Sequence, residues 1–225
     1  MDAELDADRK LFDRASTVEL LAAALRERII KGIYLPGERL AEEAIVKSAK
    51  VSRNSLREAF RLLTHERLLV HELNRGVFVR KLTVDDVVDL YRVRKLVECN
   101  AVRSLTQRPK QADDMVDAVA AGDLAMKSED WRGLGTANMM FHQAVGALAD
   151  SPRIDELMRN ILAEQRLVFH VVADPRRLHE PFLERNKEIL AAIEAGDGPR
   201  AERLLLKYLE DSEQQIVAAY RNANA

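Results

Sequence analysis

Residues 51–60 read Val-Ser-Arg-Asn-Ser-Leu-Arg-Glu-Ala-Phe, and this stretch decides how the N-terminal part of the chain is interpreted. Arg53, Arg57 and Arg61 are spaced four residues apart, so they stack along one face of a helix from about Ser52 to His65. Small polar residues at the start of such a helix suit base edges in a major groove of DNA, and arginines suit phosphates. An exposed amphipathic helix with solvated arginines is the alternative that this helix alone leaves open.

The start of this helix carries several candidate caps. Ser55 and Glu58 have the spacing of a capping box, and Ser52 and Asn54 are further candidates. A different face of the helix is apolar and can seat it on a core; its residues are Leu56, Phe60 and Leu63.

The elements on either side give the order of a winged helix-turn-helix. Helical periodicity begins near Ser16 and stops at residues 32–37, where Gly and Pro interrupt the chain, and a short helix fits 41–49. After the arginine-bearing helix, two short apolar runs at 68–70 and 77–79 indicate a β-hairpin. The hairpin tip carries Arg75 and Gly76, which can reach a neighbouring groove or the DNA backbone.

Charge and composition agree with a nucleic-acid-binding module in an intracellular protein. The chain has a net charge of −2, yet residues 50–80 hold seven Lys or Arg against three acidic residues. Cys99 is the single cysteine, which excludes an intrachain disulfide and a cysteine-based zinc cluster. The chain shows neither a signal-peptide pattern nor an apolar stretch long enough for a membrane span. We therefore expect a soluble cytoplasmic protein without a membrane partner.

We expect a mainly α fold in two domains. Residues 1–13 are predicted as a flexible arm, 14–80 as the winged helix-turn-helix, 81–84 as a linker and 85–225 as an all-α helical bundle. Gly- and Pro-containing breaks divide the bundle into six predicted helices, at about 84–107, 110–128, 133–150, 153–172, 177–195 and 199–222.

The N-terminal motifs closely resemble the GntR family of bacterial regulators. The resemblance covers about residues 18–80 and rests on three motifs in order: 30–40 (IKGIYLPGERL), 51–60 (VSRNSLREAF) and 75–79 (RGVFV). It implies a DNA-binding protein and assigns most DNA contacts to one set of residues: Ser52, Arg53, Asn54, Ser55, Arg57, Arg75 and Gly76. Glu43 departs from the family, which often has a basic residue there.

The helices after residue 84 carry polar residues on faces that should be buried. Because a buried polar group costs several kcal/mol unless it has a partner, a set of them on four inner faces indicates a shared polar cavity. The alternative for each residue singly is a satisfied core side chain. The set comprises Arg94, Glu98, Asn138, His142, Asn186 and Tyr208.

These helices resemble the FCD ligand-binding domain of FadR-type GntR regulators. The motifs are 85–98 (DDVVDLYRVRKLVE), 138–145 (NMMFHQAV) and 189–197 (ILAAIEAGD), and six helices suggest the shorter VanR-like branch. Many members of this group bind a divalent metal with an Asp and three His. Those positions here are Asn138, His142, Asn186 and Tyr208, so His142 is the only retained ligand type. We therefore predict no tightly bound transition metal and no cofactor.

Without a metal, Arg94 is expected to bind a carboxylate directly. The predicted effector is a small organic acid held by Arg94, with hydrogen bonds from Asn138, His142, Asn186 and Tyr208, while Glu98 anchors Arg94 or binds the ligand. Arg166 is a weaker candidate. A two-fold homodimer would match a pseudo-palindromic operator, and the ligand would act through its differential affinity for two placements of the DNA-binding domains.

Three alternatives carry different functions. An enzyme is disfavoured because the chain has no recognisable nucleophile motif and no phosphate-binding Gly-rich loop. A metal sensor is disfavoured by the three lost ligands. A constitutive repressor, whose C-terminal domain only dimerises, would keep the polar residues in internal hydrogen bonds.

Overall fold

The computed structural model describes residues 17–171 and 174–223, so the predicted arm over residues 1–13 lies outside the described residues. Residue contacts divide the chain into two compact units, Met1–Lys81 and Leu82–Ala225. Each unit is described by itself below.

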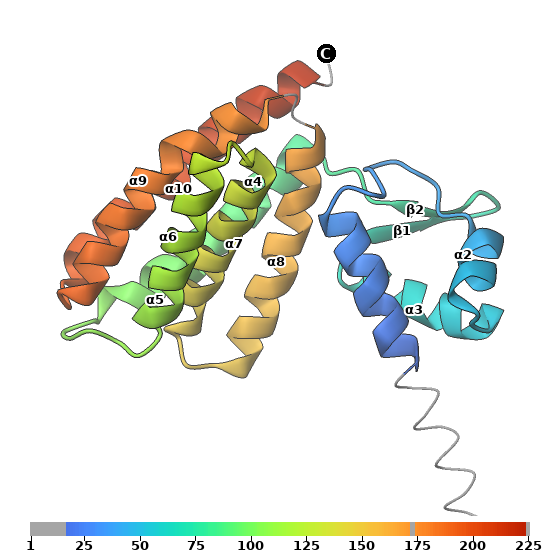
Figure 1. Cartoon of the computed structure of the whole chain (residues 1–225), viewed down its shortest axis with the longest axis horizontal. Coiled ribbons are helices and arrows are strands. Elements are labelled where there is room, and N and C mark those ends of the chain that lie inside the picture. The colour runs from blue at the N-terminus through green and yellow to red at the C-terminus, as the bar shows by residue number, and fades with distance from the viewer. Residues whose placement is uncertain (1–16, 172–173, 224–225) are drawn as a thin grey trace, which may run out of the picture. The chain divides into compact units, whose positions relative to one another are not determined.

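The N-terminal unit is a winged helix-turn-helix, as predicted. A helix over residues 17–30 precedes α2 (Glu42–Ala49) and α3 (Arg53–His65). The wing is an antiparallel pair in which β1 (Leu69–Glu72) runs beside β2 (Gly76–Val79) (Figure 1).

Apolar residues at helical spacing hold these helices together. Leu21, Leu25 and Ile29 of the first helix are buried, as are Leu56 and Leu63 of α3. Burying one stripe of α3 leaves the stripe that carries its arginines free of the core. The packing of α3 therefore determines which of its faces meets solvent.

The segment before α2 fixes the wing to the unit. The Leu40 amide donates to the carbonyl oxygen of Val77 at 2.9 Å, and the Val79 amide donates to that of Glu38 at 2.9 Å. Residues 38–40 thus lie along β2 and extend its hydrogen bonding, which places Arg39 beside the wing.

The C-terminal unit consists of helices. In chain order they are α4 (Val84–Arg94), the π-helical turn η1 (Lys95–Cys99), α5 (Asn100–Arg103), α6 (Ala112–Lys127), α7 (Trp131–Ala147), α8 (Pro152–Val171), α9 (Pro175–Glu194) and α10 (Gly198–Ala223). Since α4, η1 and α5 follow one another without a break, the described part of this unit contains the six predicted helical segments. No helix among the described residues is long and apolar enough to cross a membrane.

The first of these segments differs from the prediction in two respects. The helix predicted over about 84–107 is present as α4, η1 and α5, but it contains a π-helical turn at Lys95–Cys99 and ends at Arg103. The chain beyond Arg103 packs against the turn between α9 and α10. An added Cβ at Gly196 would lie 2.5 Å from the Gln107 amide nitrogen, so this close backbone contact requires glycine. Residues 105–107 are therefore held by that turn.

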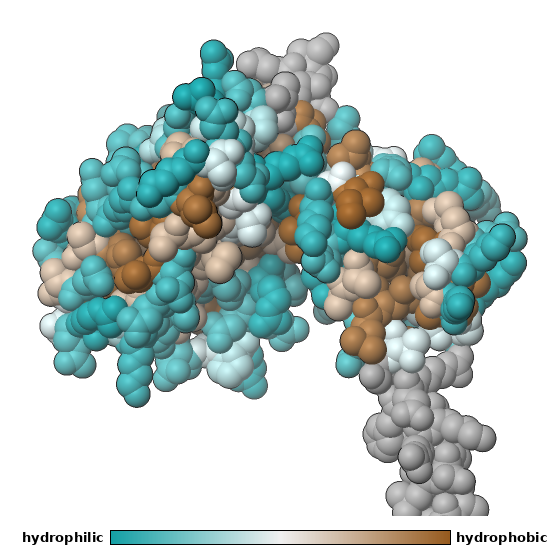
Figure 2. All heavy atoms as spheres, in the orientation of Figure 1, coloured by the Kyte–Doolittle hydropathy of each residue, from teal (hydrophilic) through white to brown (hydrophobic). Residues whose placement is uncertain are grey.

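Close packing at glycine also sets the position of α7. A Cβ added to Gly122 of α6 would lie 2.7 Å from Leu183 of α9 and 3.7 Å from Ala137 of α7. The α6, α7 and α9 helices thus approach closely at this point. On the face drawn in Figure 2, hydrophilic residues predominate and apolar residues form small separate patches.

Candidate DNA interface and effector site

The α3 helix begins with a hydrogen-bonded serine pair. Ser52 is the N-cap, and its hydroxyl accepts from the Ser55 amide at 3.0 Å. The two hydroxyls lie 2.9 Å apart, and Ser55 is buried. Ser52 is therefore the cap, and the capping box predicted at Ser55 and Glu58 is wrong, because Ser55 lies inside α3 and donates its amide to the cap. The expected DNA contact of Ser55 remains a prediction. Arg53 and Asn54 are exposed at the helix start, and their expected DNA contacts remain predictions as well.

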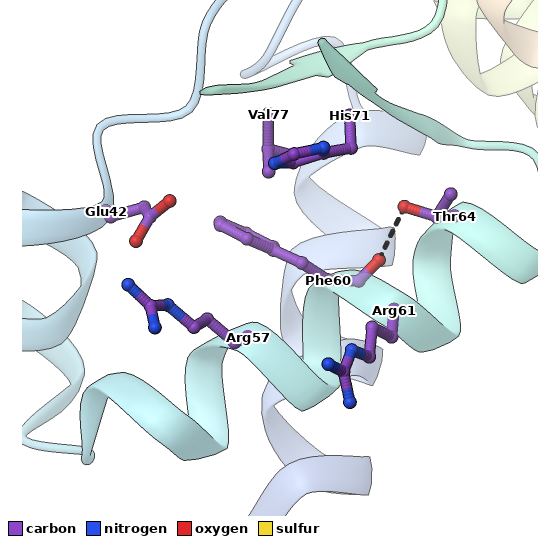
Figure 3. A pocket seen from close by; sticks show the side chains of 7 residues that line it. All are labelled: Glu42, Arg57, Phe60, Arg61, Thr64, His71 and Val77. Carbon is purple, nitrogen blue, oxygen red and sulfur yellow. Dashed lines mark hydrogen bonds between the residues drawn. The ribbon is translucent and has the colours of Figure 1, made fainter. Parts of the chain in front are cut away.

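A groove of about 480 Å³ lies between α3 and the wing. Figure 3 shows the Arg57 guanidinium and the Glu42 carboxylate pointing toward each other across it, with the Phe60 ring between them and the strands. Arg61 lies further along the same helix, where its guanidinium donates to Glu58 at 2.9 Å. The arginines predicted to stack along α3 are thus exposed on one side of the helix. The groove is lined by Glu42, Arg57, Phe60, Arg61, Thr64, His71 and Val77.

The wing tip adds further cationic groups. Arg75 forms an ion pair with Glu72, and its guanidinium carbon lies 5.4 Å from the centre of the Phe78 ring. Gly76 has a φ of +110°, which favours glycine, and an added Cβ would meet Nε of Arg39 at 3.1 Å. Arg39 is not among the residues predicted from the sequence. Its position in the 30–40 motif was the signal that could have identified it.

A buried ion pair joins α4 to the π-helical turn. Arg94 and Glu98 are 1% and 0% exposed, and Arg94 Nε donates to Glu98 Oε1 at 2.8 Å. His142 of α7, which is 1% exposed, places Nδ1 2.6 Å from the other carboxylate oxygen of Glu98. Since π-helical turns are frequent at functional sites, the position of η1 beside this ion pair marks the pair as a candidate functional site. We call these three residues, with Asn138, Asn186 and Tyr208, the polar cluster.

The second half of the polar cluster centres on an amide. Asn138 Oδ1 accepts from the Asn186 amide at 2.7 Å and from the Tyr208 hydroxyl at 2.8 Å. The rings of Tyr208 and His142 lie 4.8 Å apart, which connects this half to the ion pair. All six residues selected from the sequence therefore lie in one continuous cluster.

Three residues that were not predicted from the sequence also bond to this site. Arg94 Nη1 donates to Gln165 of α8 at 2.9 Å, and Gln165 donates to the Tyr91 hydroxyl at 2.9 Å. The Tyr91 hydroxyl lies 2.7 Å from that of Ser212 on α10. These contacts span 71 to 121 residues of sequence, so no local pattern could have identified them.

Electrostatics favour an ionised Glu98 and a neutral His142. Burial opposes ionisation of Glu98, but the positive charge of Arg94 and the hydrogen bonds to the carboxylate outweigh it and hold the pKa of Glu98 below its usual range. Burial lowers the pKa of the His142 imidazole, and Arg94 lowers it further, while Glu98 opposes the shift. The cluster thus contains one positive and one negative charge.

A second buried set lies nearby on α7, α8 and α9. Arg166 donates to the Thr136 hydroxyl at 3.1 Å and to the Arg132 carbonyl at 3.0 Å. Burial and the charge of Arg166 lower the pKa of His179 to about 3. Gly135 makes room for both side chains, since an added Cβ would lie 2.6 Å from His179 Nε2. Arg166, the weaker candidate, therefore lies outside the hydrogen bonds of the polar cluster.

Known proteins match both units. Residues 17–79 match the family described as bacterial regulatory proteins, gntR family, and residues 89–211 match the FCD domain. The chain belongs to the GntR family. It is a DNA-binding transcriptional regulator with an FCD domain, and not an enzyme.

Individual relatives support this assignment. The Nta operon transcriptional regulator of Aminobacter aminovorans is 32% identical, covering 67% of this chain and 72% of that protein. The galactonate operon transcriptional repressor of Escherichia coli K12 is 26% identical, covering 87% and 95%. A solved structure of a GntR transcriptional regulator from Rhodococcus sp. RHA1 is 46% identical, with a TM-score of 0.86, and covers 91% of this chain and 99% of that one.

The residues of this GntR regulator do not fit the divalent metal that the FCD resemblance implies. Asn138 stands at the position of the carboxylate, and its Oδ1 already accepts two hydrogen bonds. Asn186 and Tyr208 are weak ligands for a transition metal. Within residues 17–171 and 174–223, three His, Cys, Asp or Glu side chains nowhere gather as a metal site requires.

Proposed function

We propose that the polar cluster of this GntR regulator binds a small organic acid that controls its affinity for operator DNA. Three buried polar atoms carry the proposal: Arg94 Nη2, His142 Nε2 and Asn186 Oδ1 have no hydrogen-bond partner among the described residues. Since buried polar groups are nearly always satisfied, three such atoms in one cluster support a bound polar ligand. Arg94 supplies the donor for a carboxylate.

The DNA-binding half of the proposal assigns contacts to the exposed cationic side of the N-terminal unit. Arg53, Asn54 and Arg57 contact the base edges or the backbone of a major groove. Ser52, Ser55 and Arg61 lie along the same helix. Arg75 with Gly76 contacts DNA at the wing. A homodimer would present two such units to a pseudo-palindromic operator. Because operator DNA is the target, the protein would act in the cytoplasm.

The effector site is proposed to work without a metal. The hydrogen bonds that converge on Asn138 occupy the side chain that a cation would need. We expect EDTA to leave the melting temperature of the full-length protein unchanged, and zinc, nickel and manganese to leave it unchanged as well. A metal that stabilises the protein strongly would contradict this expectation.

The test is a thermal-shift screen of carboxylic acids, followed by operator binding with each stabilising acid. The operator can be obtained by selection from random DNA duplexes. Arg94→Met should abolish the thermal shift and the change in operator affinity. Arg92→Met is the matched control, because Arg92 lies on the same helix with its side chain 66% exposed. An unchanged response in Arg94→Met would contradict the proposed role of Arg94.

A second candidate function is a constitutive regulator whose FCD domain only assembles the dimer. The internal hydrogen bonds of the cluster favour it, since both Glu98 oxygens and Asn138 Oδ1 already have partners. It predicts that no small molecule raises the melting temperature or changes operator affinity. The three unpartnered atoms favour the effector-controlled function.

A further inference from the structure

The wing has a core side and a solvent side, and Arg39 lies on its solvent side. Val77 and Val79 of β2 are buried. Gly76 and Phe78 alternate with them and are half-buried, which places both on the solvent side. Arg39 pairs with Phe78 in an antiparallel bridge. Because paired residues of adjacent strands share one side of a sheet, Arg39 lies over the outer surface of the wing.

The Arg39 guanidinium lies against the backbone of the wing tip. A Cβ added to Gly76 would meet Arg39 Nε at 3.1 Å, Nη2 at 3.5 Å and Cζ at 3.7 Å. Gly76 also has a φ of +110°, which residues other than glycine rarely adopt. The glycine therefore shapes the turn and leaves the space in which the guanidinium lies. The tip thus carries two arginines, Arg75 from the hairpin itself and Arg39 from the segment before α2.

The two arginines at the tip differ in their partners. Arg75 is engaged within the hairpin, because it forms an ion pair with Glu72 and its guanidinium carbon lies 5.4 Å from the centre of the Phe78 ring. Arg39 is exposed, and among the described residues it forms neither an ion pair nor a side-chain hydrogen bond. Its guanidinium is therefore positioned by the wing but not neutralised by it.

Acidic side chains near Arg39 offer the alternative of an internal partner. Glu42 and Glu43, at the start of α2, line the same hollow of about 340 Å³ as Arg39. Neither carboxylate comes within the 4.0 Å of Arg39 that an ion pair requires. An anion can therefore replace water at Arg39, whereas at Arg75 it must also displace Glu72, which reduces the net gain of the contact.

We propose that Arg39 binds operator DNA beside the wing tip, where its guanidinium donates to phosphate oxygens or to base acceptors in the minor groove, and that Gly76 positions it. The inference rests on the proposed DNA contacts of the N-terminal unit. It adds a contact from a third segment, which belongs neither to α3 nor to the hairpin. It also gives Gly76 a role beyond the turn, because a side chain there would displace the guanidinium.

The first experiment measures operator affinity by fluorescence anisotropy with the full-length protein. Arg39→Ala should weaken binding about tenfold. Arg75→Ala should weaken it by about threefold or less, because Arg75 has to leave Glu72 before it binds DNA. Arg28→Ala removes the same charge from an exposed position on the first helix and should change nothing. An Arg39→Ala affinity equal to that of the wild type or of Arg28→Ala overturns the contact.

Stability separates a DNA contact from a structural role. Since Arg39 has no internal polar partner among the described residues, Arg39→Ala should keep the melting temperature of the wild type. Weaker binding together with a clearly lower melting temperature assigns Arg39 to folding and overturns the contact. Arg39→Lys retains the aliphatic stem and the charge, so it serves as the conservative variant.

Two further measurements identify the acceptor on DNA. If it is a phosphate, Arg39→Lys should recover most of the affinity, and Arg39→Ala should weaken binding to every sequence and lower the salt slope of log affinity by about one. If it lies in the minor groove, Arg39→Lys should recover little, and Arg39→Ala should lose a preference for A·T pairs beside the site that α3 contacts. Either pattern supports the contact. A loss that changes neither the salt slope nor the base preference overturns it.

A double-mutant cycle tests whether Gly76 acts through Arg39. Gly76→Ala should weaken operator binding in the wild type and have little further effect in Arg39→Ala, where the guanidinium is already absent. The backbone strain of alanine at this φ is present in both backgrounds and cancels in the cycle. Additive losses would show that Gly76 acts independently and would overturn its positioning role.

Arg57→Ala separates failure of this inference from failure of the proposed function. If Arg57→Ala weakens operator binding and Arg39→Ala does not, the proposed contacts of α3 stand and the inference about the wing is wrong. If neither variant changes operator affinity, both the proposed DNA contacts and this inference are wrong.

Discussion

The arginines of α3 lie at the surface of the DNA-binding unit, whereas Arg94 of the FCD domain is 1% exposed beside Glu98, which is 0% exposed. Arg61 and its partner Glu58 keep 78% and 42% of their side-chain surfaces exposed. Solvent screens the exposed charges, which can exchange counterions for DNA phosphates at little cost. The buried pair has lost its hydration, so its free energy depends on every neighbour that replaces water. The exposed arginines can therefore exchange partners easily, whereas the buried pair depends on a fixed set of neighbours.

The largest expected effect comes from breaking the buried pair. Glu98→Ala leaves Arg94 buried without its counter-charge, and we expect the free energy of unfolding of the C-terminal unit to fall by about 3–5 kcal/mol. Urea denaturation followed by circular dichroism measures this change. The double variant Arg94→Met with Glu98→Leu removes both charges and should recover most of the loss. A loss below about 1 kcal/mol in Glu98→Ala would show that the buried pair behaves like an exposed one.

The next effect concerns DNA binding in the other unit. Arg57→Ala should weaken operator binding by about 1–3 kcal/mol, which is roughly tenfold to hundredfold, because Arg57 projects into the groove between α3 and the wing. Its exposed side chain makes no core contact, so the urea midpoint should stay the same. Fluorescence anisotropy with the selected operator measures the affinity. Arg28→Ala is the control, since Arg28 is exposed on the first helix, away from the proposed contacts.

A third effect is the dependence of stability on pH. Burial holds the pKa of His179 at about 3 in the folded protein, against 6.5 for an ordinary histidine. Below pH 6.5 the unfolded chain binds a proton that the folded chain does not, so stability is full above this pH and is lost as the pH falls toward 3. The expected loss is about 1.4 kcal/mol for each pH unit.

His179→Leu isolates this contribution. Urea denaturation at pH 7, 6 and 5 should show the wild type losing its advantage over the variant as the pH decreases. His142, whose pKa is also lowered, contributes equally to both proteins and cancels in the difference. Glu98 has a lowered pKa as well, so it affects stability only below about pH 4.5. Parallel curves for the two proteins would contradict a neutral His179.

The sequence predicted the DNA-binding unit better than the interior of the FCD domain, because the first rests on local patterns and the second on contacts between distant helices. The α3 arginines and the hairpin are local patterns, and local spacing is all that a helix face or a two-stranded turn requires. The stop at Arg103 and the π-helical turn are not local. The stop at Arg103 depends on the contact between the Gly196 turn and residues 105–107. The π-helical turn η1 adds a single residue, which leaves the spacing of the apolar residues almost unchanged, so the sequence pattern does not reveal it.

The residues of the polar cluster could be predicted from the sequence, but their hydrogen-bond partners could not. Arg94, Glu98 and His142 were found because a charged or polar residue on an apolar stripe is conspicuous in sequence. Gln165 and Ser212 were not, because each is an ordinary helix residue until its partner from a distant helix is known. Pairing across helices is fixed by tertiary packing, which the single chain does not encode in any fixed spacing.

The smallest expected effect tests the exposed side of the comparison. Glu58→Gln removes the negative charge that pairs with Arg61 at 2.9 Å, and stability should change by no more than about 0.5 kcal/mol because both side chains are largely solvated. Operator affinity should rise a few-fold for two reasons. Arg61 no longer has to leave Glu58 before it binds a phosphate, and α3 loses an acidic group from the side that is proposed to face DNA. The dependence of log affinity on log salt should steepen by up to about one.

The matched control for this prediction is Glu27→Gln, which removes the partner of Lys31 from an equally exposed pair at 2.6 Å on the first helix. That helix carries none of the proposed contacts, so neither affinity nor salt dependence should change. If Glu58→Gln behaves like this control, Arg61 does not contact DNA, and the cationic surface ends nearer to Arg57. If affinity instead falls, Glu58 itself contributes to recognition, and exposure alone does not separate a solvated pair from a functional one.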